Sequence, residues 1–314
     1  MKAKAIVIDE PGRVSLRDVV LQQPSVDDVV VDILWSGIST GTEKLLWSGN
    51  MPAFPGMGYP LVPGYEAVGR VSIAHTDNGS LSVGDLVFVP GAHCYEDVRP
   101  LFGASASRVI VKAEKVYRIS DKVGRDGVLL ALAATAFHAL SISERQLPDL
   151  IIGHGVLGRL LARLTLALGG DAPTLWEVDD ARTSGANGYT VTSAFDDKRN
   201  DYRAIMDASG DSKVLDLAIS HMAPKGEVVL AGFYEKPLSF NFAPAFMREA
   251  SMKIAAEFTP SDVLSVLDLL EQDALSLDGL VSSEASIADA GDAYEAAFTD
   301  PTCTKMVLNW RQQA

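Results

Sequence analysis

The chain is poor in cysteine, with only Cys94 and Cys303 among its 314 residues. Two thiols cannot build a multi-bridge disulfide framework or a zinc lobe with four cysteine ligands. Basic residues are also in deficit, because 27 Lys and Arg stand against 41 Asp and Glu, giving a formal net charge of −14. Phosphate binding requires clustered Lys and Arg, so neither a nucleic acid nor a bulk anionic membrane surface is expected as a partner.

Long hydrophobic runs are missing as well. The longest apolar run, residues 127–140, is too short to span a bilayer and contains His138. Residues 151–170 form a longer stretch, but two arginines interrupt it. The N-terminal "MKAKAIVIDE" has only a short apolar run before its acidic residues, which is typical of a strand and not of a signal peptide. We therefore expect a cytoplasmic protein with no transmembrane segment.

What is present is a change of pattern along the chain. Residues 1–118 contain short strand-like runs such as "AKAIVID" and "GDLVFVPG", separated by Pro, Gly, Asn and Asp turns, which is typical of a partly open β-barrel. Residues 119–258 alternate helical and strand-like segments, which indicates parallel βαβ units. Residues 259–314 end in a helix, a turn and a strand that is expected to return to the first domain. The predicted fold class is α/β, with a barrel domain and a doubly wound parallel sheet.

The strongest local motif is a glycine-rich turn that follows the strand-like "DLII" and opens a helix. It consists of Gly153, His154, Gly155, Val156, Leu157 and Gly158. In this G-x-G-x-x-G pattern the first glycine permits the tight turn, the second lets a pyrophosphate approach the backbone, and the third lets helix and strand pack closely. The helix N-terminus then presents free N–H groups to the phosphates. His154 either contacts a phosphate or faces solvent.

A dinucleotide site of this kind also needs an acidic residue at the end of the next strand, about 20 residues further on. Glu177 lies 19 residues after Gly158, at the end of "PTLWE". Its carboxylate can accept hydrogen bonds from an adenosine ribose and would repel a 2′-phosphate, so the expected cofactor is NAD and not NADP. Asp179 is the alternative residue for this role. The nearby Arg182 weakens the argument against NADP.

The order of the domains, together with "TAFHAL" and "MAPKGEVVLAGF", resembles the medium-chain dehydrogenase/reductase superfamily over nearly the whole chain. This resemblance implies a GroES-like barrel, a Rossmann domain and a homodimer. It also implies that Thr135, in "TAFHAL", lies beside the nicotinamide. The apolar segment 236–246, which follows the last buried strand, is the expected dimer interface.

The chain departs from the zinc-dependent members of this superfamily at their ligand positions. Where those members carry a cysteine, a histidine and a third ligand, this chain has Thr40, Tyr65 and Ala131. Zinc prefers thiolate, imidazole or carboxylate ligands, so no catalytic metal is expected. Oxidation of an alcohol without zinc requires hydrogen bonds and a general base to take the hydroxyl proton while a hydride leaves the carbon.

Three residues are the candidate catalytic groups, the first two of them placed by the resemblance. Thr42 lies where the family places a hydroxyl that relays the alcohol proton, although it can equally cap a turn. Tyr65 can hydrogen-bond the substrate oxygen, whereas its use as a base would need a phenol pKa well below the ordinary value of about 10. Glu66 can accept a proton if burial raises its pKa, or it can anchor the barrel.

A narrower resemblance concerns residues 36–71 and 87–108. They are similar to superfamily members that use NAD to oxidise the 3-(1-hydroxyethyl) group of a bacteriochlorophyllide or chlorophyllide to a 3-acetyl group. The expected partner is then a flat pigment, for which residues 50–60 form an apolar wall and Arg99 or Arg108 binds the propionate. Two alternatives stay open, namely a zinc-free NAD(P)H reductase of quinones or enones and a non-catalytic nucleotide-binding protein.

Overall fold

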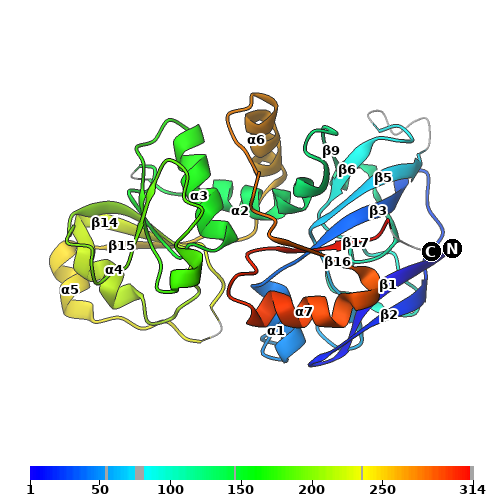
Figure 1. Cartoon of the computed structure of the whole chain (residues 1–314), viewed down its shortest axis with the longest axis horizontal. Coiled ribbons are helices and arrows are strands. Elements are labelled where there is room, and N and C mark those ends of the chain that lie inside the picture. Colours follow the sequence, from blue (N-terminus) through cyan, green and yellow to red (C-terminus); the bar gives the residue numbers. More distant parts are fainter. Residues whose placement is uncertain (54–55, 75–80, 145, 235, 312–314) are drawn as a thin grey trace. The chain divides into compact units, whose positions relative to one another are not determined.

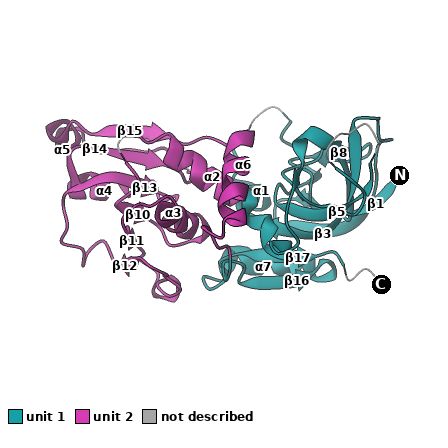
Figure 2. Ribbon diagram, turned by 90° about the horizontal axis from the view of Figure 1, so that it is seen from above, with its two compact units in different colours: residues 1–131, 278–314 teal, residues 132–277 magenta. Residues whose placement is uncertain are grey.

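The computed structural model describes residues 1–53, 56–74, 81–144, 146–234 and 236–311. The chain divides into two compact units, the first formed by residues 1–131 with 278–314 and the second by residues 132–277 (Figure 2). The domain boundaries that we expected from the sequence, at residues 118 and 258, remain predictions. No helix within the described ranges is long and apolar enough to cross a membrane.

The first unit consists mainly of short strands (Figure 1). Its strands are β1 (Lys2–Glu10), β2 (Arg13–Val20), β3 (Asp28–Ile38), β4 (Leu61–Val62), β5 (Ala67–Ile73), β6 (Leu86–Val89), β7 (Arg99–Pro100), β8 (Arg108–Lys112), β9 (Tyr117–Arg118), β16 (Ser283–Ser286) and β17 (Met306–Asn309). Its helices and 3-10 turns are α1 (Thr42–Ser48), α7 (Ala290–Thr299), η1 (Ala113–Lys115), η2 (Gly124–Leu129) and η4 (Ile287–Asp289). The strands form a smaller sheet in the order β2-β1-β4-β7 and a larger one in the order β16-β17-β3-β5-β6-β9, with β8 beside β3.

The sequence pattern of β1 explains how this unit builds its core. Lys2 and Lys4 are exposed and Ala3 and Ala5 are buried, because successive side chains of a strand face opposite sides of the sheet. Residues 6–8 are then all buried, which is typical of a strand that is covered on both faces.

The last strand of the chain joins the same unit from the far end of the sequence. β17 pairs antiparallel with β3, so that Met306 lies opposite Ile38 and Leu308 lies opposite Ser36. This register brings Lys305, the residue before β17, next to the end of β3. A side chain from the C-terminal return therefore reaches the region that carries the candidate catalytic residues.

The second unit contains a parallel sheet with helices. Its strands are β10 (Leu150–Ile152), β11 (Thr174–Trp176), β12 (Thr190–Thr192), β13 (Tyr202–Asp207), β14 (Met222–Leu230) and β15 (Ser251–Ile254), in the order β12-β11-β10-β13-β14-β15. The helical segments are α3 (Val156–Ala167), η3 (Asp180–Arg182), α4 (Leu215–His221), α5 (Phe242–Arg248) and α6 (Pro260–Glu271), while α2 (Leu130–Ser141) begins in the first unit. All neighbouring strands are parallel. The strand order reverses at β10, and in sheets of this type ligands bind outside the carboxyl ends of the strands at that point.

Candidate active site

Tyr65 follows a tight turn that carries the chain from β4 in the smaller sheet to β5 in the larger one. Gly64 has a φ of 102°, in the region that only glycine adopts readily. A Cβ at this position would lie 2.7 Å from the backbone nitrogen of Ser105, so the turn also leaves no room for a side chain. The backbone nitrogen of Ser105 donates to Pro63 O at 3.0 Å, which holds the turn in place.

The hydroxyl of Tyr65 lies in a small cluster of hydroxyl groups. It is 2.6 Å from Ser39 Oγ and donates to Thr42 Oγ1 at 3.4 Å. The ring of Phe102 packs edge-on against the half-buried tyrosine ring, with their centroids 5.0 Å apart. Tyr65 and Thr42, both candidate catalytic groups from the sequence, thus lie together, whereas Ser39 was missed although the hydroxyl-rich run "STGT" was an available signal.

The surroundings of Tyr65 disfavour its ionised form. Burial raises the pKa of the Tyr65 phenol well above its ordinary value, and the adjacent Glu66 carboxylate raises it further. The phenol is therefore protonated at neutral pH and acts as a hydrogen-bond donor. Thr42 is free to interact with it, because the N-cap residue of α1 is Gly41 and no side chain caps this helix.

Glu66 is fully buried and forms an ion pair with Lys305. Lys305 Nζ donates to Glu66 Oε2 and, at 3.0 Å, to the backbone oxygen of Ile38, and the lysine side chain is itself 1% exposed. Burial raises the pKa of Glu66, and the ammonium group of Lys305 opposes that rise. A Cβ on Gly37 would overlap the Glu66 carboxylate and lie 2.9 Å from Lys305 Cε, so this glycine makes room for the pair.

A second buried carboxylate lies close to the first. Glu43, on α1, accepts a hydrogen bond of 2.6 Å from the hydroxyl of Tyr294, on α7. Burial raises the pKa of Glu43 to about 8, and the nearby Glu66 contributes to the rise. Sequence reasoning missed Lys305 and Tyr294, which are separated from their partners by 239 and 251 residues.

The glycine-rich turn of the second unit has the geometry that its motif predicts. Gly153 follows β10 with a φ of 96°, and a Cβ there would lie 3.1 Å from the backbone of Ser209. A Cβ on Gly158, in the first turn of α3, would overlap Gly153. A Cβ on Gly155 would meet nothing within 4 Å, so the backbone at the start of α3 is accessible to a ligand. Val156 and Leu157 are the first two residues of that helix.

His154 does not face solvent. Its ring is fully buried, with Nδ1 2.6 Å from the backbone oxygen of Arg182 and Nε2 2.9 Å from the hydroxyl of Tyr189. The guanidinium of Arg159 also donates to the backbone oxygen of Arg182 at 3.2 Å and to that of Ser184 at 2.8 Å. These contacts fix the segment after η3 against the glycine-rich turn.

Glu177 comes directly after β11 and is tied to the same turn. Its Oε2 accepts from the backbone nitrogen of His154 at 3.0 Å, and its Oε1 accepts from those of Val178 and Asp179 at 2.8 and 2.9 Å. The carboxylate is thus positioned by three backbone N–H groups. Thr135 lies on α2 and is half-buried.

The remaining positions singled out from the sequence are the former zinc-ligand positions and the expected apolar wall. Thr40 is exposed and Ala131 is buried without a ligating atom. Across the described ranges, no group of three or more His, Cys, Asp and Glu side chains could hold a metal ion. Within the expected apolar wall, Phe54 and Pro55 lie outside the described residues.

The alcohol dehydrogenase GroES-like domain family matches residues 25–121, and the predicted GroES-like and Rossmann fold class is confirmed. Two relatives carry the name 2-desacetyl-2-hydroxyethyl bacteriochlorophyllide A dehydrogenase. The one from Cereibacter sphaeroides is 49% identical over 100% of both chains, and the one from Rhodobacter capsulatus is 50% identical over 99% of both. An alcohol dehydrogenase of Escherichia coli CFT073, solved with NADH, has a TM-score of 0.83 at 20% identity, covering 98% of this chain and 99% of that one.

Proposed function

The chain belongs to the bacteriochlorophyllide dehydrogenase branch of the medium-chain dehydrogenase/reductase superfamily, and from this membership we propose that it oxidises a 3-(1-hydroxyethyl) bacteriochlorophyllide to the 3-acetyl pigment. The observation that carries the proposal is the identity of about half of all residues with both relatives over the full length of the chain. The chain is an oxidoreductase acting on a CH–OH group, so neither a quinone reductase nor a non-catalytic nucleotide-binding protein is favoured.

The second unit fits a nicotinamide cofactor. The open backbone at Gly155 and the free N–H groups at the start of α3 suit a pyrophosphate. When bound, such a cofactor accepts the hydride that leaves the hydroxyethyl carbon. Gly153 and Gly158 contribute by letting the turn and the helix lie close to the sheet, and Thr135 is assigned to the nicotinamide end.

Within this site we assign NAD rather than NADP. Glu177 Oε2 accepts only one of the three backbone hydrogen bonds, so a lone pair stays available for a ribose hydroxyl. The same negative charge repels a 2′-phosphate. His154 supports this role of Glu177 indirectly. Its backbone N–H holds the Glu177 carboxylate, and its buried ring contacts the backbone oxygen of Arg182.

In the first unit we assign the substrate hydroxyl to the cluster around Tyr65. Tyr65 is protonated, so it takes the proton of the alcohol only by passing its own proton on to Ser39 or Thr42, and the half-buried Thr42 in turn releases its hydroxyl proton to water. Glu66 is assigned a supporting role, since Lys305 occupies its Oε2. Thr40, Tyr65 and Ala131 do not fit a zinc ion, and no step is assigned to one.

A single assay tests this function. The purified protein is mixed with NAD and the 3-hydroxyethyl pigment, and the pigment absorption band and NADH formation are followed with and without a chelator. We expect a shifted band, stoichiometric NADH and no effect of the chelator. A protein that leaves both signals unchanged would not be this dehydrogenase, and inactivation by the chelator would contradict the metal-free assignment.

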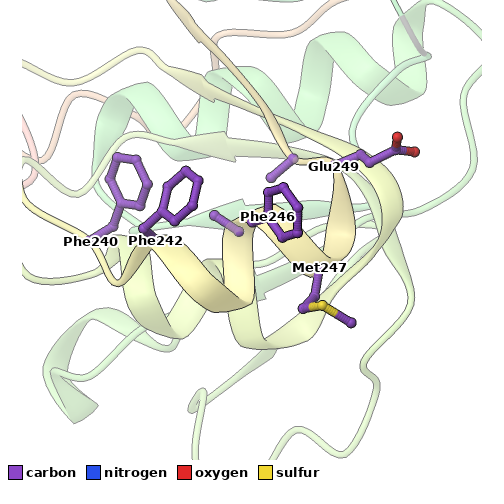
Figure 3. Close-up of a pocket in the computed structure, with 7 residues that line it drawn as sticks. Phe240, Phe242, Phe246, Met247 and Glu249 are labelled. Atoms are coloured by element: carbon purple, nitrogen blue, oxygen red, sulfur yellow. The ribbon is translucent and has the colours of Figure 1, made fainter.

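We also propose that a second copy of the chain covers the apolar surface formed by α5 and β15. Figure 3 shows Phe240, Phe242, Phe246 and Met247 around a pocket on this surface, and the last three are 71%, 65% and 76% exposed. β15 is the edge strand of its sheet, and an uncovered edge of this kind readily pairs with another chain.

Light scattering on a size-exclusion column tests the dimer. The native chain is expected to elute with twice the monomer mass and Phe246→Glu with the monomer mass, because a charge would be buried in the interface. A matched control, Leu264→Glu, alters an exposed apolar residue on α6 and should leave the dimer intact. A monomeric native chain would contradict the proposal.

A further inference from the structure

The arginines of the first unit are mostly neutralised by carboxylates. Arg108, one of the two expected to bind the pigment propionate, holds Asp32 through two hydrogen bonds, Nε to Oδ1 and Nη2 to Oδ2 at 2.9 Å. This pairing raises the pKa of Arg108 and leaves its guanidinium engaged. The other arginines with a carboxylate within 4.0 Å in this unit are Arg13, Arg17, Arg70, Arg118 and Arg125.

Arg99 differs from these residues. Its exposed side chain makes no hydrogen bond or ion pair with any residue in the described ranges, although it lies on a strand at the edge of the smaller sheet. A Cβ on Gly58 would overlap the guanidinium and lie 3.2 Å from its Cζ, so the charged group rests against the backbone of Gly58. Gly58 belongs to residues 50–60, the expected apolar wall, in which the neighbouring Met57 and Tyr59 are partly buried against the core.

The strand pairing relates Arg99 to the hydroxyl cluster. Arg99 on β7 lies opposite Leu61 on β4, and the two strands run parallel. The chain after β4 then turns at Gly64, and the ring of Tyr65 contacts the ring of Phe102, three residues beyond Arg99. Tyr65 lies four positions after Leu61, a separation that spans no more than about 14 Å of chain even if fully extended. Arg99 and Tyr65 therefore belong to two neighbouring chain segments of the first unit, residues 99–102 and 61–65.

We propose that Arg99 binds the propionate carboxylate of the pigment and makes the enzyme prefer the free acid to an ester. The inference rests on the proposed function. A substrate anion approaches a chain with a net charge of −14, so a cation without a carboxylate partner is the group that can offset the repulsion. The planar guanidinium suits a carboxylate because it can donate two parallel hydrogen bonds. An esterified propionate cannot accept this charged pair.

The test compares the pigment acid with its methyl ester in the native enzyme and in Arg99→Met. We expect the native kcat/KM to be about tenfold or more higher for the acid than for the ester. A factor of this size follows from the usual strength of a hydrogen bond between charged groups. In Arg99→Met the KM for the acid should rise by the same factor while kcat and the ester kinetics stay unchanged, and Arg99→Lys should retain part of the preference.

Two controls separate the outcomes. Lys44→Met removes an exposed cation on α1, and the acid preference should survive this change. Equal turnover of acid and ester by the native enzyme, or loss of the preference in Lys44→Met instead of Arg99→Met, would overturn the assignment of Arg99. Absence of turnover for both pigments would instead contradict the proposed function itself.

Discussion

Lys305→Met is expected to destabilise the first unit by about 3 to 5 kcal/mol, because it leaves the Glu66 carboxylate buried without its cation. Glu66 is fully buried and Lys305 is 1% exposed, so water cannot replace the lost partner. Glu66 Oε1 already has no hydrogen-bond partner within the described chain, and the substitution would leave Oε2 in the same condition. The backbone oxygen of Ile38 would also lose its 3.0 Å hydrogen bond from Lys305 Nζ.

The measurement needs a signal that reports on the first unit alone. The chain has four tryptophans, of which Trp35, Trp47 and Trp310 lie in the first unit and Trp176 in the second. Denaturant unfolding followed by tryptophan fluorescence in a Trp176→Phe background therefore reports mainly on the first unit. The double variant Glu66→Gln/Lys305→Met is expected to recover most of the loss, because both charges are then absent. Comparing the variants as a double-mutant cycle isolates the coupling energy between the two side chains.

Two results would refute this reasoning. A loss of less than about 1 kcal/mol in Lys305→Met would mean that solvent reaches Glu66 and that the pair behaves like a surface ion pair. A double variant no more stable than Lys305→Met would mean that the lysine stabilises the unit through its packing and its bond to Ile38, and not through its charge.

Three further predictions concern the candidate site. Glu43 has a pKa of about 8 in the folded chain against an ordinary 4.5, so its contribution to stability should be lost as the pH rises from about 4.5 through 8, and denaturation midpoints should show a flatter pH dependence in Glu43→Gln. Tyr65→Phe should lower kcat by about a hundredfold with little change in KM, and a kcat within threefold of the native value would exclude the phenol from proton transfer. Glu177→Gln should weaken NAD binding, measured by titration calorimetry, and improve NADP binding, whereas an equal loss for both cofactors would assign discrimination to Asp179.

The parts of the site that could be predicted are those with a local signature. Gly153, Gly155 and Gly158 specify a turn through their own backbone requirements, and Glu177 follows at the end of the next strand in the same βαβ unit. The α/β fold class could be predicted for a related reason, since the change from alternating strands to strand–helix repeats is visible over any short window.

The parts that could not be predicted depend on partners far apart in the sequence. Nothing local indicates that Lys305 will meet Glu66, because the contact follows from the register of β17 on β3. His154 shows the same limit within one motif. Sequence reasoning offered a phosphate contact or a solvent-facing ring, whereas Arg182 and Tyr189 from a later segment enclose the ring.

The charges buried beside Tyr65 determine what this residue can do. Glu43, with a pKa of about 8, is mostly protonated at neutral pH, and Glu66 is balanced by Lys305. Neither carboxylate is therefore left as an uncompensated charge, and no cation among the described residues lowers the pKa of the phenol. Tyr65 must then serve the reaction through the hydrogen bonds that its neutral hydroxyl makes with Ser39 and Thr42. The pH profile of kcat should therefore show no change below about pH 10 that arises from ionisation of the phenol.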